Sequence, residues 1–291
     1  MRIAERIPLE IVSMDSAMVY RGMDIGTAKP TPAARAAVPH HLIDILDPRE
    51  TYSAGRFARD AGAAIRQITA RGRLPLLVGG TLLYLRALRD GLAALPDADL
   101  AIRMRLDAEG AALGWPALHR RLQEVDAAAA SRIAPTDPQR IQRALEVHEI
   151  TGRPLTELQG SEDGSPRPQV LAIALVPAER AALAARIERR FDAMVDEGFV
   201  AEVATLRARG DLRPDLPSMR AVGYRQVWAH LDGEYDWTEA RRRAIVATRQ
   251  LAKRQMTWLR RDHDCERWIA PSPGLEERII ERISSQWVPS S

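Results

Sequence analysis

Two short apolar runs, separated by a helical segment, constrain the fold of this chain more than any other feature. Residues 9–14 (LEIVSM) and 74–78 (LPLLV) are mostly apolar without strict alternation, which is typical of strands buried on both faces. Between them, Ser53 can cap a helix whose apolar residues keep helical spacing, and Gly72 can end it. A strand, a helix and a strand of this kind predict a parallel sheet covered by helices, the α/β class.

The middle of the chain has a different character. Between residues 97 and 168 strand-like runs are missing, and short helical segments take their place. Asp137 and Pro138 form an N-cap and first-turn signal for a helix that Gly152 can end. This stretch is therefore predicted to be all helical.

A polar segment and a return to strand suggest how the chain is divided. Residues 160–168 (GSEDGSPRP) are rich in Gly, Ser and Pro and predict a linker, and residues 169–176 (QVLAIALV) predict a further strand. We therefore predict an α/β core of residues 1–96 and 169–291, interrupted by a helical insertion of residues 97–168.

Composition excludes several classes of protein. Hydrophobic residues make up 46% and charged residues 28% of the 291 positions, which is typical of a folded chain and not of a disordered one. Cys265 is the one cysteine, so a disulfide framework and a cysteine-rich zinc site are excluded. No run approaches the roughly 18 apolar residues of a membrane span, and the N-terminus has no signal-peptide core. We therefore expect a cytoplasmic protein. For the adjacent His40 and His41 we expect buried or capping roles and no metal site.

The basic residues are almost all arginine. Of the 42 Lys and Arg side chains only Lys29 and Lys253 are lysine, and with 39 acids the net charge is +3. So small an excess does not by itself indicate a nucleic-acid partner. Codon usage in a GC-rich genome is the default explanation for the arginine bias, which leaves the two lysines as exceptions.

Asp15 and the sequence Gly79-Gly80-Thr81 each follow a predicted parallel strand. Ligands of open α/β sheets bind at the carboxyl ends of the strands. Asp15 is therefore a candidate general base or metal partner, although a turn or capping role fits its position as well. The glycines would let backbone N–H groups approach an anion, and Thr81 adds a hydroxyl, but an ordinary strand-to-helix turn can have the same residues.

The glycine-rich segment 22–29 (GMDIGTAK) looks like a phosphate loop but fails its template. The Walker pattern has four residues between its glycines and a lysine directly after the second one. Here three residues separate Gly22 from Gly26, and Lys29 follows three positions later. We reject a Walker motif and keep the possibility of a glycine-rich loop close to a ligand.

Two arginine-containing segments have both a functional and a structural interpretation. Gln139, Arg140 and Arg143 share a helical face that is either solvated or in contact with phosphate. In residues 218–225 (SMRAVGYR) two arginines flank a glycine. They either bind pyrophosphate in bidentate fashion or lie exposed at a loop-to-helix junction.

The last long helix has the strongest compositional signal. Residues 241–261 contain eight basic residues and no acid. A charge of one sign, without internal salt bridges, favours a phosphate-backbone partner over a merely solvated face. Trp258 lies among these residues, and we expect it to belong to the core rather than to stack on a base.

These segments occur together and in the same order in a known family. The blocks are MDSAMVYRGMDIGTAKP (residues 14–30), PHHLIDILDP, PLLVGGTLLYLRAL, DPQRIQRALEV, SMRAVGYRQVW and ATRQLAKRQMTWLR. In them the chain resembles the bacterial tRNA dimethylallyltransferases, also called tRNA isopentenyltransferases. The resemblance implies a P-loop-NTPase-like parallel sheet of the ATP-binding type, flanked by helices, and a helical insertion that grips the anticodon stem-loop of tRNA.

The resemblance also implies a reaction. The family transfers a dimethylallyl group from dimethylallyl diphosphate to the exocyclic amine of the adenine 3′-adjacent to the anticodon, with Mg²⁺ as the expected cofactor. By position Asp15 resembles the catalytic base and Thr81 a residue beside the target amine, and Arg220 is a candidate to stabilise the leaving diphosphate. The positions that resemble tRNA contacts are Asp15, Ser16, Ala17, Met18, Thr81, Arg103, Gln139, Arg140, Ile141, Gln142, Arg143, Arg220, Ala221, Val222, Gly223, Tyr224, Arg225, Lys253, Arg254, Gln255, Met256, Thr257, Trp258, Leu259 and Arg260.

One block of the family pattern is not present in this sequence. The family begins with a strand and a GxxxxGK[ST] loop before a helix that would end near Arg6, and this sequence starts at Met1. We expect a mis-called start or a truncation to account for the difference. We also expect a sheet without one central strand, no diphosphate cradle and no phosphate-loop ligand for Mg²⁺.

Three functions remain open from the sequence. The first is the transferase, expected to act as a monomer, and the second is a tRNA-binding paralogue that does not catalyse transfer. The third, a relative that prenylates free adenine nucleotide, is disfavoured because a nucleotide needs neither the helical insertion nor the basic helix.

Overall fold

The chain folds into two compact units. The computed structural model describes residues 1–91, 93, 95–159 and 168–287. One unit consists of Met1–Leu88 and Pro168–Ser291, and the other is Arg89–Arg167. The sequence predicts boundaries after residues 96 and 168, whereas the contacts divide after residues 88 and 167. Each unit has a hydrophobic core of its own, and most of the predicted linker 160–168 lies outside the described residues.

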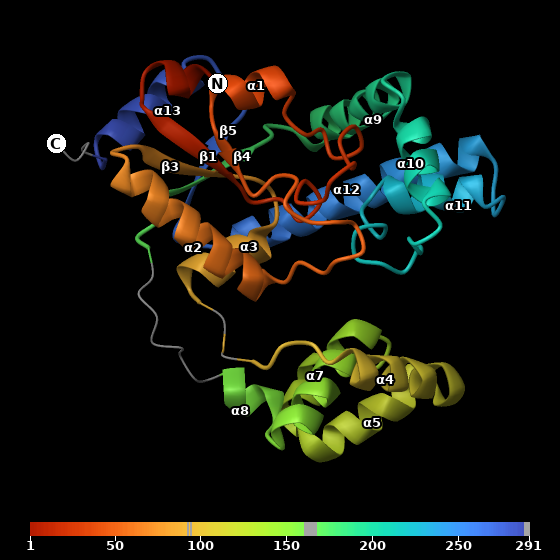
Figure 1. Cartoon of the computed structure of the whole chain (residues 1–291). Helices are drawn as coiled ribbons and strands as arrows, with labels where there is room; N and C mark the ends of the chain where they lie inside the picture. Colours follow the sequence, from red (N-terminus) through yellow and green to blue (C-terminus); the bar gives the residue numbers. More distant parts are fainter. Residues whose placement is uncertain (92, 94, 160–167, 288–291) are drawn as a thin grey trace. The chain divides into compact units, whose positions relative to one another are not determined.

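Parallel strands form the centre of the first unit, as the sequence predicts. β1 (Leu9–Ser13) lies between β2 (His40–His41) and β3 (Leu74–Val78), and both pairs are parallel (Figure 1). β4 (Ala172–Val176) and β5 (Cys265–Ile269) form a second parallel pair. Within the described residues β3 and β4 are each paired on one side only, so two sheets stand where the sequence predicts one sheet lacking a central strand.

The other regular elements of this unit are helical. They are η1 (Arg2–Glu5), α1 (Pro32–Ala37), α2 (Ala54–Ala70), α3 (Leu82–Arg89), α9 (Arg180–Asp196), α10 (Phe199–Ala208), α11 (Tyr224–Leu231), α12 (Trp237–Arg261) and α13 (Leu275–Ser284). α2 packs on β1 and β3 through Phe57, Ala61 and Ile68, which are fully buried. Ser53 Oγ accepts the N–H of Arg56 at 3.1 Å and starts α2 where the sequence predicts.

Every regular element in the described residues of the second unit is a helix. Its helices are α4 (Leu100–Leu113), α5 (Trp115–Val125), α6 (Ala127–Arg132), α7 (Pro138–Thr151) and α8 (Leu155–Gln159). Asp137 caps α7 by accepting the N–H of Arg140 at 3.2 Å, and Gly152 ends it with a φ of +70°. Leu106, Leu122 and Ile141 are fully buried in the core that these helices share.

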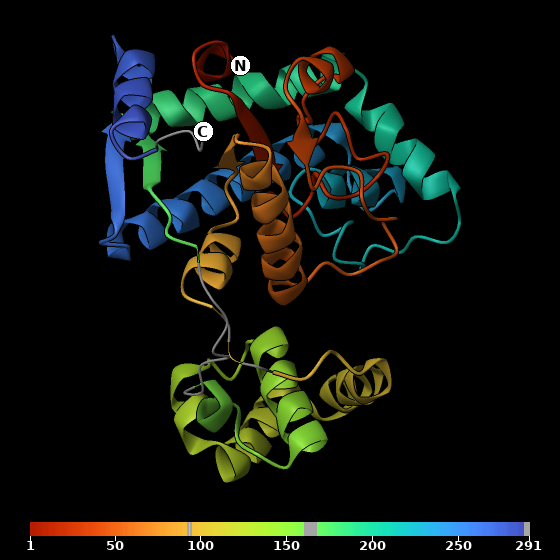
Figure 2. The same ribbon diagram turned by 60° about the vertical axis from the view of Figure 1, so that its left-hand side comes forward.

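The C-terminal part contains two elements that the sequence analysis does not predict. β5 and α13 follow α12, and Figure 2 shows β5 beside β4. The sequence of β5, CERWI, carries adjacent charged residues and lacks an apolar run, so only its pairing with β4 makes it a strand. β4 in turn begins at Ala172 instead of residue 169, because its partner is five residues long and Ala172 pairs with Cys265.

Candidate functional site

The turns that follow β1 and β3 are in contact, which brings two predicted site segments together. The N–H of Thr81 donates to the carbonyl of Met14 at 3.2 Å, and the N–H of Ser16 donates to Thr81 Oγ1 at 3.1 Å. Gly79 permits this approach, because a Cβ atom there would lie 2.1 Å from Met14 O. The first glycine therefore allows two turns of the chain to touch.

Asp15 lies in this contact, half-buried, directly after Met14. Its Oδ1 accepts the N–H of Ala17 at 2.8 Å and that of Met18 at 3.2 Å, so the side chain caps its own turn. Within the part of the chain that the structure describes, Oδ2 makes no hydrogen bond. One oxygen therefore orients the carboxylate and confirms the turn-capping interpretation, which leaves the other oxygen able to accept a proton, and the catalytic role stays a prediction.

Helix α12 reaches the same turns through Gln255. Its Nε2 donates to the carbonyl of Gly80 at 2.9 Å. A Cβ atom at Gly80 would lie 2.4 Å from that nitrogen, so a larger residue would have to displace the end of the Gln255 side chain. Asp15, Ser16, Thr81 and Gln255 are thus brought together from three segments that are far apart in the sequence.

The basic helix α12 is neutralised in its N-terminal half. Acids of α9 and of the helix itself pair with four of its arginines, in contrast to the predicted lack of salt bridges. The pairs are Arg241–Asp192, Arg242–Glu239, Arg243–Glu239 and Arg249–Glu188. The sequence analysis missed them because Asp192 and Glu188 lie on another helix and Glu239 lies just before the segment that was counted.

The C-terminal half of α12, residues 253–261, keeps its charge. Lys253, Arg254 and Arg261 are exposed and have no acidic partner among the residues that the structure describes. Trp258 is 42% exposed, so the expectation that it belongs to the core is wrong. The half-buried face of this segment is formed instead by Gln255, Met256, Thr257 and Leu259. An exposed indole among unpaired cations is suited to a base and a phosphate backbone.

The turn before α11 exposes its arginines and buries its tyrosine. Arg220 and Arg225 are exposed, Ala221 and Val222 are half-buried, and Gly223 is buried. Tyr224 is fully buried and donates its hydroxyl to Glu202 at 2.5 Å. Burial, together with this bond to a carboxylate, raises the pKa of Tyr224. Of this block, the two arginines are exposed, and Tyr224 supports the turn from inside.

Arg225 also lines a cavity of about 510 Å³ beside α11 and α12. Tyr235, Arg242, Arg243 and Gln250 lie on its walls. Arg225 is the one predicted site residue among those that line this cavity, so the cavity and the Asp15 turn are formed by different residues.

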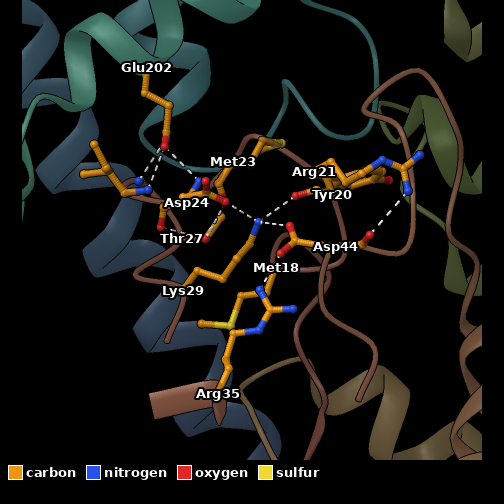
Figure 3. A network of polar contacts seen from close by, with 12 residues as sticks. Met18, Tyr20, Arg21, Met23, Asp24, Thr27, Lys29, Arg35, Asp44 and Glu202 are labelled. Atoms are coloured by element: carbon orange, nitrogen blue, oxygen red, sulfur yellow. Dashed lines mark hydrogen bonds and ion pairs between the residues drawn. The ribbon is translucent and has the colours of Figure 1, made fainter. Parts of the chain in front are cut away.

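The glycine-rich segment 22–29 binds an anion that belongs to the chain itself. The N–H groups of Asp24, Ile25 and Gly26 donate to the carboxylate of Glu202 at 2.8, 2.7 and 3.1 Å (Figure 3). Successive N–H groups of this kind form an anion-binding concavity. In this protein an internal acid occupies it, which explains why the segment resembles a phosphate loop without matching the Walker template.

In the helical unit, two arginines predicted to contact RNA hold a buried acid. Arg103 Nε donates to Glu146 Oε1 at 2.8 Å, and Arg143 Nη1 donates to Glu146 Oε2 at 2.7 Å. Burial opposes the ionisation of Glu146, but the hydrogen bonds from the two arginines outweigh it and hold the pKa of this carboxyl below its usual value. Both arginine side chains stay about a third exposed, at 33% and 28%.

The other predicted contacts of this unit differ in exposure. Gln139 and Arg140 are exposed, and Gln142 is half-buried and donates to Asp107 at 2.7 Å. Ile141 is fully buried, so its side chain belongs to the core. Glu146 was missed although the sequence contains a signal for it, since an acid between Leu145 and Val147 falls on an apolar face three residues after Arg143.

No metal-binding cluster emerges from the described part of the chain, where no three His, Cys, Asp or Glu side chains gather around one point. His40 Nδ1 lies 2.6 Å from the carbonyl of Val38, and His41 Nε2 lies 2.7 Å from Glu10 Oε2. Both residues lie in β2 and are half-buried, so they are neither fully buried nor helix caps, in contrast to the roles that the sequence predicts. None of the described helices is both long and apolar enough to cross a membrane.

Comparison with known proteins agrees with this geometry. The family model described as IPP transferase matches residues 18–262. A tRNA dimethylallyltransferase from Thioalkalivibrio sulfidiphilus is 59% identical over 97% of this chain and 85% of its own length. The crystal structure of a tRNA isopentenylpyrophosphate transferase from Bacillus halodurans has a TM-score of 0.70 and 38% identity, covering 98% of this chain and 90% of that one. A eukaryotic dimethylallyltransferase acting on tRNA shares the fold, with a TM-score of 0.79 at 23% identity over 100% of this chain and 77% of that one.

Proposed function

The chain belongs to the IPP transferase family, and we propose that it is a tRNA dimethylallyltransferase. In this proposal it transfers a dimethylallyl group from dimethylallyl diphosphate to the exocyclic amine of the adenine 3′-adjacent to the anticodon, and releases diphosphate. The observation that carries the proposal is the contact between the turns after β1 and β3, which places Asp15 beside Ser16 and Thr81.

Asp15 is the group that we assign to the proton. An adenine amine is a weak nucleophile, because its lone pair is delocalised into the ring. As the bond from this nitrogen to the allylic carbon forms and the bond from that carbon to the diphosphate oxygen breaks, the amine must lose one proton. Oδ2 of Asp15 can accept it while Oδ1 stays bonded to Ala17 and Met18, so the carboxylate keeps its direction during the step.

Thr81 and Arg220 complete the assignment. Thr81 Oγ1 is tied to the N–H of Ser16, and its hydroxyl is positioned to orient the target amine beside the base. Negative charge grows on the diphosphate as it leaves, and the exposed Arg220 is assigned to stabilise it. The adenine has to leave the stack of the anticodon loop to reach these groups, as in other enzymes that modify a base.

RNA binding is assigned to one charged surface in each unit. In the first unit this is residues 253–261, where Lys253 and Arg254 are unpaired and Trp258 is exposed. In the helical unit it is the face with Gln139, Arg140 and the partly exposed guanidinium groups of Arg103 and Arg143. Both surfaces fit the phosphate backbone of an anticodon stem-loop.

Mg²⁺, which the family resemblance implies, has no set of protein ligands among the described residues. The described residues therefore form no all-protein cage, and Mg²⁺ usually needs only one or two carboxylates together with substrate phosphates. No step above involves the metal. The monomeric state and the cytoplasmic location are predictions from the sequence.

Substitution of Asp15 tests the proposed reaction. Asn at this position keeps the oxygen that caps Ala17 and Met18 but cannot take up a proton, so Asp15→Asn is expected to lower the single-turnover rate by about 10²–10⁴. The affinity for an anticodon stem-loop should change less than about threefold. Asp215→Asn, the same change at an exposed acid that pairs with Arg213 outside the assigned site, is the matched control.

The assay uses dimethylallyl diphosphate, Mg²⁺ and a stem-loop, and follows the mass of the modified adenine. It is run on the chain from Met1 and on a version extended upstream in the gene. A single-turnover rate of Asp15→Asn within about threefold of the wild type would remove the assignment of Asp15. RNA binding without transfer in both lengths of the chain would favour the non-catalytic paralogue.

A further inference from the structure

Lys29 is a buried cation in a loop to which the reaction assigns no role. Its side chain is 4% exposed, and its ammonium lies 2.8 Å from Tyr20 O, 2.5 Å from Asp24 Oδ1 and 2.6 Å from Asp44 Oδ1 (Figure 3). Asp44 also accepts from Arg35 Nη1 at 2.6 Å. We call these five residues the Lys29 clasp.

The clasp explains why this position is lysine in a chain that otherwise uses arginine almost everywhere. An ammonium carries three N–H donors on one nitrogen, and here three oxygens of different residues surround that nitrogen. No nitrogen of a guanidinium carries more than two N–H groups, and the group is planar and larger. Arginine at position 29 therefore cannot satisfy the same three acceptors within the same space.

A continuous path of bonds joins the clasp to the carboxylate of Asp15. Lys29 holds the side chain of Asp44, the backbone N–H of Asp44 donates to Met18 O at 3.2 Å, and the N–H of Met18 donates to Asp15 Oδ1 at 3.2 Å. The path is three bonds long and enters the same turn that orients Asp15.

The backbone at Asp44 needs this support. Its φ is +58° and that of Leu42 is +63°, in the left-handed region that costs free energy for residues other than glycine. The carboxylate of Asp44, held by Lys29 and Arg35, keeps the residue in this conformation, and the conformation aims its N–H at Met18. Without Lys29 the segment can relax toward an unstrained backbone and withdraw that donor.

We infer that Lys29 is a positioning residue for the transfer reaction, acting on Asp15 through Asp44 and Met18. The inference rests on the proposed function, because it gives the clasp a role in the step assigned to Asp15. A misplacement of about 1 Å at a reacting group is enough to cost on the order of 10² in rate. We expect Lys29 to affect the chemical step and not the affinity for RNA.

The test compares Lys29→Arg with Arg213→Lys, an exchange of the same two cations at an exposed residue outside the assigned sites. Single-turnover transfer at saturating stem-loop should fall about 10–100-fold in Lys29→Arg, with the RNA affinity changed less than about twofold. Arg213→Lys should stay within about twofold in both. Asp44→Asn, which weakens the clasp from its other side, should reproduce the Lys29→Arg result. Thermal melts identify the temperature at which every variant is folded.

Amide hydrogen exchange provides a second measurement that does not depend on activity. In Lys29→Arg the amides of Ala17 and Met18 should exchange at least about tenfold faster than in the wild type, while those of α7 keep their rates. Unchanged exchange at residues 17–18 would overturn the inference, and so would faster exchange together with an unchanged transfer rate. If neither the chain from Met1 nor the upstream-extended version catalyses transfer as wild type, the proposed function is contradicted. The exchange measurement would then still show whether Lys29 holds the turn of residues 15–18.

Discussion

The two lysines of this chain lie in contrasting environments. Lys29 is enclosed by three oxygens in the clasp, whereas Lys253 is exposed on α12 with no acidic partner among the described residues. The arginines of α12 show the same contrast within one helix. Four arginines up to Arg249 are paired with acids, whereas Arg254 and Arg261 have no acidic partner in the part of the chain that the structure describes. A cation with short bonds to the chain holds the fold, and a cation without them is available to a substrate.

This comparison also explains why net charge was a poor guide. The overall charge of +3 arises from 42 basic and 39 acidic residues, so most of the charges can be neutralised within the chain. Positive charge that no acid neutralises is confined to short segments, and residues 253–261 form one such segment. The surface assigned to RNA is therefore recognised by where salt bridges are missing, and not by where arginines are most frequent.

The largest expected difference between the two regions is in stability. Lys29→Met leaves Asp44 and Asp24 without their shared cation, and the free energy of unfolding should fall by about 2–3 kcal/mol. The effect is below that of a fully buried pair because both acids are partly exposed. Lys253→Met should stay within about 0.5 kcal/mol of the wild type. Urea unfolding of the two variants measures both values, and equal losses would show that burial does not separate the two lysines.

A smaller effect is expected in the salt dependence of RNA binding. Replacing Lys253 and Arg254 together by Ala should weaken stem-loop binding about tenfold near 0.1 M salt and reduce the log–log salt slope by about 1.4–1.8, for two phosphate contacts. The matched control replaces Arg242 and Arg243, which Glu239 already neutralises, and should leave the slope nearly unchanged. Titrations between 50 and 200 mM salt measure the slopes. A similar loss in both double variants would show that pairing does not decide which arginines meet RNA.

The smallest expected effect is on the pH dependence of stability. Burial opposes the ionisation of Asp44, but the hydrogen bonds from Lys29 and Arg35 outweigh it, so the pKa of Asp44 is lowered in the folded state. A lowered pKa stabilises the fold at pH values above the unfolded value of about 3.9, and this contribution is lost as pH falls through the folded pKa. Between pH 5 and 3 Lys29→Met should therefore lose less stability than the wild type, by about 1 kcal/mol, whereas Lys253→Met should follow the wild type. Urea midpoints across this range measure the difference, and parallel curves for the wild type and Lys29→Met would contradict it.

Local signals in the sequence were enough to predict most of the elements. The strand at residues 74–78, the cap at Ser53 and the helix that begins after Asp137 all follow from interactions within a few residues, and the structure has each of them. The fold class and the family could also be predicted, because each motif is a short stretch of sequence and the motifs occur in the order typical of the family.

Elements and roles that depend on distant partners could not be read in this way. β5 becomes a strand only through β4, and Trp258 is exposed because the face of α12 that packs inward is set by neighbours elsewhere in the chain. Nothing near Glu202 in the sequence indicates that its carboxylate fills the N–H groups of residues 24–26, which lie more than 170 positions away.

The candidate site also has one part that the sequence predicts and another part that depends on the fold. Asp15, Thr81 and Lys29 are visible in the sequence as motif residues, since each follows a strand or lies in a glycine-rich segment. Only the tertiary structure decided that Thr81 bonds to Ser16, that Gly79 is required by Met14 O, and that Lys29 supports Asp15 from a separate loop. The physical reason is range: caps and helical periodicity act over a few residues, whereas hydrogen bonds between turns and the pairing of charges depend on which distant segments the fold brings within about 3 Å.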